Sequence, residues 1–326
     1  MNTIQNIFKA KLNNVFGMIH VKPLPGTPLY GRSIKQIIYT ACKEAEIYMK
    51  CGVDGIVVEN MHDIPYVPAK EIGPEIVSSM TRVCSSIRQL VPEHIPCGLQ
   101  ILAAANKEAI AVAHATDFQF IRAEGFVFGH VADEGYMDAC AGKLLRYRKS
   151  IDAQNVCIFT DIKKKHSSHA ITHDVSLIET AKAAEFFLTD GIIVTGTATG
   201  QPAKPSDLIE VKSSVNVPVL VGSGITVNNV HEYRGADGFI IGSHFKKHGM
   251  WQNELNETTT EIKKLNFILN ISYHIIDSIQ KINEHKPLTS FFIFMTYKHL
   301  KYVTALGSIT TINCYKLHLN KNGQRN

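Results

Sequence analysis

Two glycine-containing segments, residues 219–226 (VLVGSGIT) and 235–243 (GADGFIIGS), have the composition of a backbone site for an anion. Glycine lets the chain approach a phosphate closely, and successive N–H groups in such turns can donate to its oxygens. Tight turns without a ligand would need the same residues, but two such segments in succession favour phosphate binding. The predicted phosphate-binding residues are Gly222, Ser223, Gly224, Gly242 and Ser243.

Polar side chains also follow six other short apolar segments, where they could take part in proton transfer or hold negative charge. Any one of them, such as Glu59, is as readily explained by a structural ion pair, whereas the whole set is typical of an active site. We assign Asp161 or Glu59 as general base, Lys163 or Arg122 as the group that stabilises developing negative charge, and His20 or His166 as proton shuttle. The predicted substrate-binding residues are Asn60, Gln100, Arg122 and Thr195.

Residues 161–169 (DIKKKHSSH) place three consecutive lysines and two histidines after one of these segments. Alternation from the aspartate favours Lys163 as the inward-facing lysine, with Lys165 as second choice. Such a lysine could hold an anionic substrate, form a Schiff base or stabilise an enolate, although lysine runs are usually solvated. His166, His169 and Asp174 could also bind a divalent metal, but proton transfer or exposure is favoured for the histidines. We therefore predict no cofactor.

Residues 123–135 (AEGFVFGHVADEG) combine several glycines with aromatic side chains, as expected for a loop that folds over a ligand. Closure of this loop would bring Glu124, His130 or Asp133 to the bound ligand. The alternative is a loop whose Phe126 and Phe128 pack on the rim of the domain.

The elements that must position these groups follow a repeating order. Eight apolar segments are expected to form strands, and most of them are apolar on successive residues, as in strands buried on both faces. They alternate with segments of helical periodicity, which favours an α/β protein with a closed (β/α)8 TIM barrel over an open sheet. No G-x-G-x-x-G turn follows the first strand, which weakens a dinucleotide-binding alternative. The expected strands are residues 15–20, 54–59, 97–102, 118–122, 156–161, 191–195, 217–222 and 238–242, and the helices 33–50, 71–91, 106–115, 138–149, 174–188, 206–213 and 226–234.

The chain has 326 residues, of which 45% are hydrophobic, enough for one α/β barrel and a further segment. We predict an N-terminal extension over residues 1–14, the barrel over 15–254, and an atypical tail over 255–326. The tail contains 2 of the 22 glycines and a helical pattern over 265–282 that could replace the last barrel helix.

The excess of positive charge lies in this tail: residues 1–254 hold 25 basic and 25 acidic residues, whereas 255–326 hold 9 and 4. A neutral body predicts that nucleic acid is not a partner, unless the tail binds it. No apolar run predicts a membrane span. The seven cysteines include no C-x-x-C pair, which favours reduced thiols and a cytoplasmic location, with a mitochondrial one as alternative. A homo-oligomer is left open.

Five motifs, residues 17–26 (GMIHVKPLPG), 52–60 (GVDGIVVEN), 120–122 (FIR), 161–166 and 222–224, resemble those of the BtpA family over residues 14–254. The resemblance implies a ribulose-phosphate-binding-type TIM barrel. It also implies the glycine turns and the mouth positions His20, Glu59, Asn60, Arg122, Asp161, Lys163 and His166. The cyanobacterial namesake is associated with photosystem I biogenesis, and a bacterial relative with sugar utilisation. The tail departs from the family's short final helix.

These observations favour an enzyme that acts on a small phosphorylated metabolite, either a sugar phosphate or a nucleotide. Proton transfer, carbon–carbon or glycosidic bond chemistry would make it a lyase, isomerase or hydrolase. The alternative is a non-catalytic assembly or stability factor that keeps the barrel.

Overall fold

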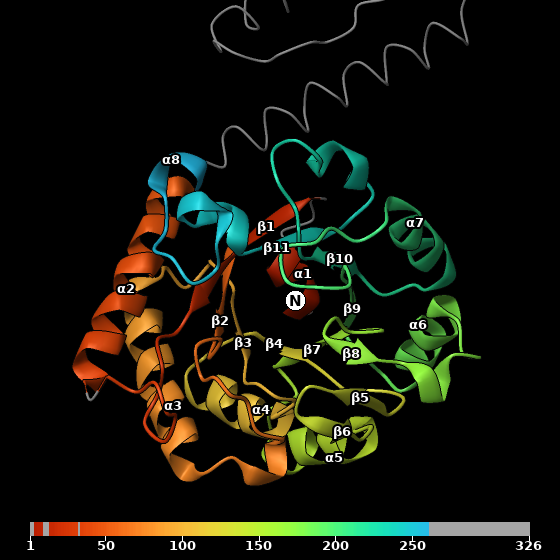
Figure 1. Ribbon diagram of the computed structural model, residues 1–326, viewed down its shortest axis with the longest axis horizontal. Helices are drawn as coiled ribbons and strands as arrows, with labels where there is room; N and C mark the ends of the chain where they lie inside the picture. Colours follow the sequence, from red (N-terminus) through yellow and green to blue (C-terminus); the bar gives the residue numbers. More distant parts are fainter. Residues whose placement is uncertain (1–2, 9–12, 32, 261–326) are drawn as a thin grey trace, which may run out of the picture. The chain divides into compact units, whose positions relative to one another are not determined.

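Eight parallel strands close into a barrel in the computed structural model, which describes residues 3–8, 13–31 and 33–260 (Figure 1). Hydrogen bonding between the first and last strands closes the sheet, and β1 is in register with both neighbours, through Phe16 with Gly55 and with Ile240. The expected (β/α)8 architecture is therefore confirmed. The barrel strands are β1 (Asn14–His20), β2 (Gly55–Glu59), β3 (Cys97–Gln100), β4 (Phe120–Ala123), β7 (Cys157–Asp161), β9 (Gly191–Val194), β10 (Val219–Gly222) and β11 (Gly238–Ile241).

Every residue of the eight barrel strands is buried, because helices cover the outer face and side chains fill the interior. This explains why the strand segments are apolar on successive residues. The surrounding helices are α2 (Ile34–Cys51), α3 (Pro74–Leu90), α4 (Asn106–Ala115), α5 (Ala141–Ser150), α6 (Leu177–Phe186) and α7 (Pro205–Ser214), with a short 3-10 turn η1 (Ala69–Glu71) before α3.

The helix predicted over residues 226–234 is only a 3-10 turn, η3 (Val230–Tyr233), between β10 and β11. Side chains at its start bind the backbone instead of continuing a helix: Asn229 Oδ1 accepts from the Thr226 N–H, and Asn229 Nδ2 donates to the Gly224 carbonyl. These bonds also fix the turn that follows β10.

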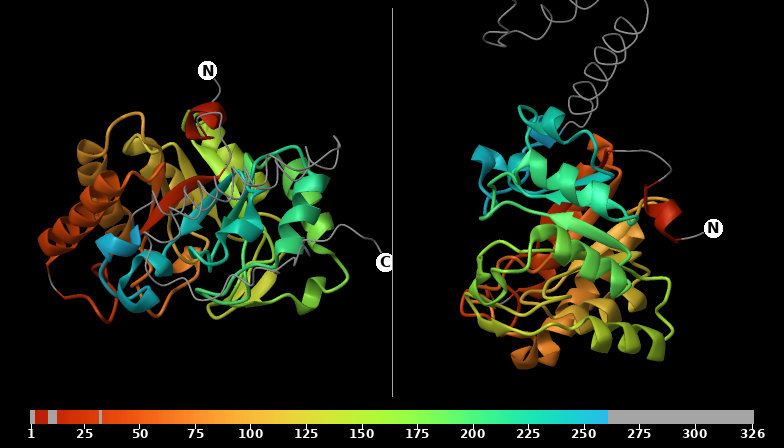
Figure 2. Two further views of the ribbon diagram at one scale, coloured as in Figure 1. Left: turned by 90° about the horizontal axis from the view of Figure 1, so that it is seen from above. Right: turned by 90° about the vertical axis from the view of Figure 1, so that its right-hand side faces the viewer.

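A short helix, α1 (Thr3–Phe8), lies within the predicted N-terminal extension and covers one end of the barrel (Figures 1 and 2). Its Ile7 and Phe8 belong to the interior apolar cluster, and the Phe8 ring lies 6.2 Å from that of Phe16 and 5.7 Å from that of Phe159. A residue pair from α1 thus plugs the end of the barrel opposite the carboxyl ends of its strands.

A three-stranded antiparallel sheet joins two loops at the carboxyl ends of the barrel strands. It consists of β5 (His130–Ala132), β6 (Gly135–Met137) and β8 (Ser167–Ser168), so the predicted covering loop after β4 pairs with the loop after β7. A 3-10 turn, η2 (Ala170–Thr172), follows β8.

After β11 the chain forms two 3-10 turns, η4 (Ser243–Phe245) and η5 (Lys247–Gly249), and then a short helix, α8 (Glu257–Thr260), that contacts α2. The predicted helix over 265–282 and all of the tail after residue 260 lie outside the described residues. None of the helices in the described ranges combines the length and apolarity needed to cross a membrane.

Candidate functional site

The carboxyl ends of the barrel strands surround a cavity, which we call the central cavity, with an empty volume of about 370 Å³ including open solvent. It brings together the predicted groups His20, Glu59 and Arg122 with both glycine turns. Side chains from the first, second and fourth barrel strands thus meet the turns that follow the seventh and eighth. The lining residues are Met18, His20, Glu59, Met61, Arg122, Lys165, Thr199, Gly200, Gly222, Ser223, Gly224, Ile240, Gly242 and Ser243.

The two glycine turns leave backbone donors unused. The N–H groups of Ser223, Gly224, Ser243 and His244 have no hydrogen-bond partner within the described part of the chain. The buried Ser223 hydroxyl is also without a partner there. Several unpaired N–H donors in neighbouring turns suit an anion with several acceptor oxygens. We call these two turns the glycine cradle.

Small residues are required in the cradle by their neighbours. Gly224 has a positive φ of 64°, and a Cβ atom there would collide with the backbone of Pro202. A Cβ on Gly242 would lie 3.2 Å from the His20 ring. Glycine is therefore needed at these positions for packing as well as for binding, because the loops after β9 and β10 pack tightly against each other.

Arg122 and Asp161 form a buried ion pair across the neighbouring strands β4 and β7. Arg122 Nε donates to Asp161 Oδ2 at 2.9 Å and Nη2 donates to Oδ1 at 3.0 Å. Both carboxylate oxygens of Asp161 are therefore occupied, and this aspartate holds the arginine in place. Of the two residues predicted as general base, Glu59 is left with the freer carboxylate.

Glu59 is buried and makes no side-chain hydrogen bond to a described residue; His20 Nε2 lies 3.8 Å from its Oε2. Burial raises the pKa of Glu59, and the Arg122 charge opposes this only in part. A carboxyl group with a raised pKa keeps its proton to a higher pH, which suits it to act as a general acid as well as a general base.

His20 is oriented by the segment after β11. Its Nδ1 lies 3.2 Å from the carbonyl oxygen of Trp251, which can only accept, so Nδ1 carries the proton and Nε2 faces Glu59 as an acceptor. Burial and the Lys246 charge hold the pKa of His20 well below its ordinary value. His20 is therefore a neutral imidazole in the resting protein.

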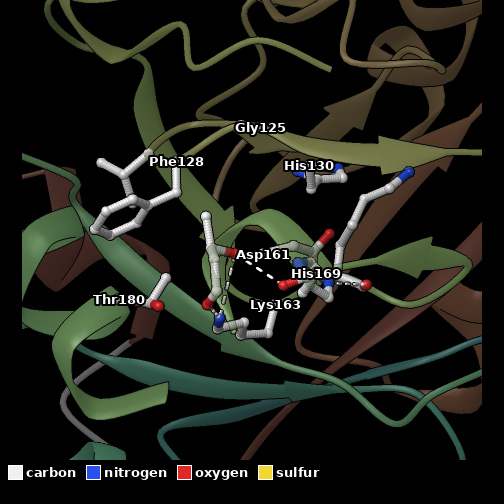
Figure 3. A pocket seen from close by; sticks show the side chains of 11 residues that line it. Gly125, Phe128, His130, Asp161, Lys163, His169 and Thr180 are labelled. Carbon is white, nitrogen blue, oxygen red and sulfur yellow. Dashed lines mark hydrogen bonds between the residues drawn. The ribbon is translucent and has the colours of Figure 1, made fainter. Parts of the chain in front are cut away.

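Lys163 and Lys165 enter different cavities. Lys165 lines the central cavity, whereas Lys163 Nζ donates to the Thr172 carbonyl at 2.8 Å and lines a neighbouring cavity (Figure 3). The lysine that faces the central cavity is therefore Lys165, which the sequence analysis gave as second choice after Lys163. Alternation from Asp161 fails because Lys163 has a φ of 46°, which turns the chain out of strand geometry.

That neighbouring cavity, the lid cavity, lies under the loop after β4 (Figure 3). His130 is 5% exposed, its Nε2 has no partner in the described residues, and its ring lies 5.3 Å from that of His169. Burial and the Lys164 charge lower the pKa of His130 to about 4. Phe126 is buried and Phe128 lies at the rim of this cavity, as the packing interpretation of the loop expects, and closure over a ligand stays a prediction.

The loop residue Glu124 is fixed by Lys164, whose Nζ lies 3.3 Å from Oε1, with both side chains buried. This pair ties the loop after β4 to the loop after β7. The sequence prediction treated the lysines as alternatives for one site, and no spacing rule separates a lysine that pairs locally from one that enters a cavity.

Three predicted substrate-binding residues lie near the central cavity without lining it. Asn60 is engaged in the structure: Oδ1 accepts from the Leu102 N–H, and Nδ2 donates to Asp63. Gln100 Oε1 and Thr195 Oγ1 are buried and have no partner in the described part of the chain. The last two atoms remain available for a ligand group or water.

His166 lies outside the central cavity and connects two loops. Its Nε2 accepts from the backbone N–H of Thr199 at 3.1 Å and lies 2.8 Å from the Thr199 hydroxyl. His169 instead bonds the Lys164 carbonyl. Within residues 3–8, 13–31 and 33–260, no three His, Cys, Asp or Glu side chains are placed to hold a metal ion, so His166, His169 and Asp174 do not converge as a metal site there.

The segment after β11 contributes residues that the sequence prediction missed. Lys246, 1% exposed, donates to both carboxylate oxygens of Glu44 on α2, at 2.7 and 2.8 Å. This pair fastens the segment whose Trp251 carbonyl orients His20. A lysine in a mixed polar segment carries no periodic signal, so only the three-dimensional structure reveals the contact.

Solved structures share the barrel at low sequence identity. Wild-type GGGPS from Thermoplasma volcanium matches with a TM-score of 0.50 and 15% identity, covering 81% of this chain and 97% of that one. Tryptophan synthase from M. tuberculosis matches with a TM-score of 0.50 and 13% identity, covering 80% and 97%. At such identities the likeness shows the fold alone.

Sequence relatives are closer. A Caenorhabditis elegans protein labelled mitochondrial is 53% identical over 263 residues, 78% of this chain and 94% of that protein. The photosystem I biogenesis protein BtpA of Synechocystis is 33% identical over 258 residues, 78% of this chain and 87% of that protein. The model of the BtpA family matches residues 11–266. The chain belongs to the BtpA family.

Proposed function

We propose that this protein is an enzyme that acts on a small phosphorylated metabolite, a sugar phosphate or a nucleotide, bound in the central cavity. One observation carries the proposal: the glycine cradle, with its unpaired N–H groups, opens into the same cavity as the Glu59 carboxyl. A phosphate on the cradle would hold the rest of the ligand beside a group able to transfer protons.

The contacts of the site residues suggest a separate role for each group of them. Gly222, Ser223, Gly224, Gly242 and Ser243 bind the phosphate. Glu59 is the general acid or base, because burial raises its pKa and no hydrogen bond to a described residue occupies its oxygens.

Arg122 and Asp161 act as a unit in this proposal. Arg122 stabilises negative charge that develops on the substrate, and Asp161 holds the guanidinium in position. His20, with its Nε2 free to accept a proton, relays protons to or from Glu59. This set of groups suits a lyase, an isomerase or a hydrolase.

The test is thermal unfolding of the full chain with inorganic phosphate, ribose 5-phosphate and nucleoside monophosphates. A ligand present at 100 times its Kd stabilises the protein by about 2.7 kcal/mol, which raises the Tm by several degrees. We expect at least one phosphorylated compound to raise the Tm in this way. The rise should be larger than the one caused by a sulfate-free buffer of the same ionic strength.

Two charge variants locate the binding. Ser223→Asp places a carboxylate in the cradle and is expected to abolish the stabilisation by phosphate. Ser213→Asp adds the same charge at an exposed site on α7 and should leave it unchanged. Equal responses of the two variants, or no stabilisation by any phosphorylated compound, would overturn the proposal.

A second candidate is a non-catalytic assembly or stability factor, and the name of the Synechocystis relative supports it. The thermal test separates the two functions, because a scaffold that has lost its ligand gains no stability from phosphorylated compounds.

The label of the Caenorhabditis elegans relative supports a mitochondrial rather than a cytoplasmic location. Imaging of the full chain with a C-terminal fluorescent tag against a mitochondrial marker would decide between them.

A further inference from the structure

Lys165 is the only lysine that lines the central cavity among the described residues. It follows β7, on the same loop as Lys163 and Lys164, and its side chain is half-buried. The other members of that lining include the cradle glycines and Glu59, so an amine there would face any ligand held by its phosphate.

The Lys165 amine differs from its neighbours because nothing engages it. Lys163 Nζ donates to the Thr172 carbonyl, Lys164 Nζ pairs with Glu124, and Lys246 Nζ pairs with Glu44. Lys165 Nζ has neither a hydrogen bond nor an ion pair to any described residue. Without such a partner, the Lys165 amine is available to a ligand in the central cavity.

The surroundings of Lys165 favour an uncharged amine. Burial lowers its pKa, and so does the nearby positive charge of Arg122, whereas Glu59 and Asp161 oppose the shift. A neutral amine has a free lone pair and is a nucleophile toward carbonyl carbon. Arg122 keeps its charge in the same cavity, so the two basic residues differ in what they can do.

We propose that Lys165 forms a Schiff base with the carbonyl carbon of a phosphorylated aldehyde or ketone held by the glycine cradle. This inference rests on the proposed function and narrows the substrate class to carbonyl compounds such as open-chain sugar phosphates.

Glu59 supplies the proton transfers that this step needs. The Lys165 nitrogen bonds to the carbonyl carbon, and one amine proton passes to the carbonyl oxygen, giving a carbinolamine. The protonated Glu59 carboxyl then donates to the hydroxyl, the C–O bond breaks to release water, and the nitrogen lone pair forms the C=N bond. The products are a cationic iminium and the Glu59 carboxylate, so charge and protons balance.

Reductive trapping tests the proposal on the full chain. The protein is incubated with dihydroxyacetone phosphate or ribulose 5-phosphate and sodium cyanoborohydride, which reduces an iminium to a stable secondary amine. Intact mass and peptide mapping then locate the adduct. We expect one adduct at Lys165, exceeding by about tenfold the labelling of Lys163 or of the exposed Lys70, because the bound phosphate holds the carbonyl beside the amine.

Two controls make the result specific. Excess inorganic phosphate should suppress the adduct by occupying the cradle. Lys165→Arg should abolish the adduct while retaining stabilisation by inorganic phosphate, and circular dichroism shows that the variant is folded. The labelling comparison among lysines of the unmodified protein needs no variant, so it holds even if Lys165→Arg is unstable.

Equal labelling of Lys163 and Lys165, or no adduct with either probe, would overturn the Schiff-base proposal. If phosphate still raises the Tm in that case, the proposed phosphate site stands and Lys165 acts as a charge alone. If phosphate has no effect either, both proposals fail.

Discussion

Arg122 and Asp161 meet through two parallel hydrogen bonds of 2.9 and 3.0 Å between neighbouring barrel strands. The guanidinium also approaches the first glycine of the cradle, since a Cβ at Gly222 would lie 3.5 Å from Arg122 Nη2. The arginine thus spans the mouth from β7 to β10, and Asp161 determines where its positive charge is placed.

Removing the Asp161 charge should strongly destabilise the protein. Asp161→Asn leaves the buried guanidinium, 6% exposed, without its counter-ion, and breaking a buried pair in this way costs about 3–5 kcal/mol. Urea denaturation of the variant and the unmodified chain measures the difference. The matched control is Glu71→Gln, which breaks the exposed Lys70–Glu71 pair and should change the free energy of unfolding by less than about 0.5 kcal/mol.

A double variant, Arg122→Met with Asp161→Leu, checks the cause of that loss. Replacing both charges with apolar groups removes the unpaired ion, so stability should recover most of the amount lost in Asp161→Asn. A double variant as unstable as the single one would mean that packing, and not the buried charge, explains the effect.

Much of the barrel is predictable because burial leaves a local signal. Strands covered on both faces need successive apolar residues, and the carboxyl end of each strand needs a polar residue or glycine to form the mouth. All eight predicted strands overlap the observed ones for this reason. The turn at η3 departs from prediction because side-chain bonds of Asn229 override a weak helical period.

The site is less predictable because contacts between distant residues leave no such signal. Strand position places Glu59 and Arg122 in the mouth, but which lysine enters the cavity depends on the positive φ of Lys163. Likewise Lys246 and Glu44 are 202 residues apart, and their pairing follows only from closure of the barrel.

The N-terminal plug should contribute measurably to stability. Phe8→Ala removes a ring that is 7% exposed and packs against Phe16 and Phe159, and truncating a buried phenylalanine costs about 3–5 kcal/mol. Phe186→Ala is the control, because that ring is 81% exposed and its loss should cost no more than about 0.5 kcal/mol. Calorimetry compares the two. Similar values would show that α1 does not close the barrel.

His130 should make stability depend on pH below neutrality. Its pKa falls from 6.5 to about 4 on folding, so the unfolded chain binds the proton more tightly. The contribution is complete above pH 6.5 and is lost as the pH falls from 6.5 through 4. The difference between a pKa of 6.5 and one of about 4 corresponds to about 3 kcal/mol.

The variant His130→Asn isolates this contribution, because it cannot titrate. Its free energy of unfolding should fall less steeply between pH 6.5 and 4 than that of the unmodified chain, measured by urea denaturation at each pH. His94→Asn, at an exposed position, should keep the original slope. Parallel curves for all three proteins would contradict a buried neutral His130.

The contact between His166 and Thr199 should affect ligand binding although His166 does not line the central cavity. Thr199 and Gly200 do line it, and the Thr199 backbone N–H is held by His166 Nε2 at 3.1 Å. His166→Ala removes the contact that orders this loop, so the loop must become ordered when phosphate binds. The loss of about 1 kcal/mol should weaken the affinity for phosphate by about fivefold. Isothermal titration with inorganic phosphate measures the change.

His173→Ala is the control, because His173 bonds only the Ala170 carbonyl and is exposed. An unchanged Kd in His166→Ala would show that the loop is ordered without this contact, whereas an equal loss in both variants would point to a general effect of replacing a histidine near the mouth.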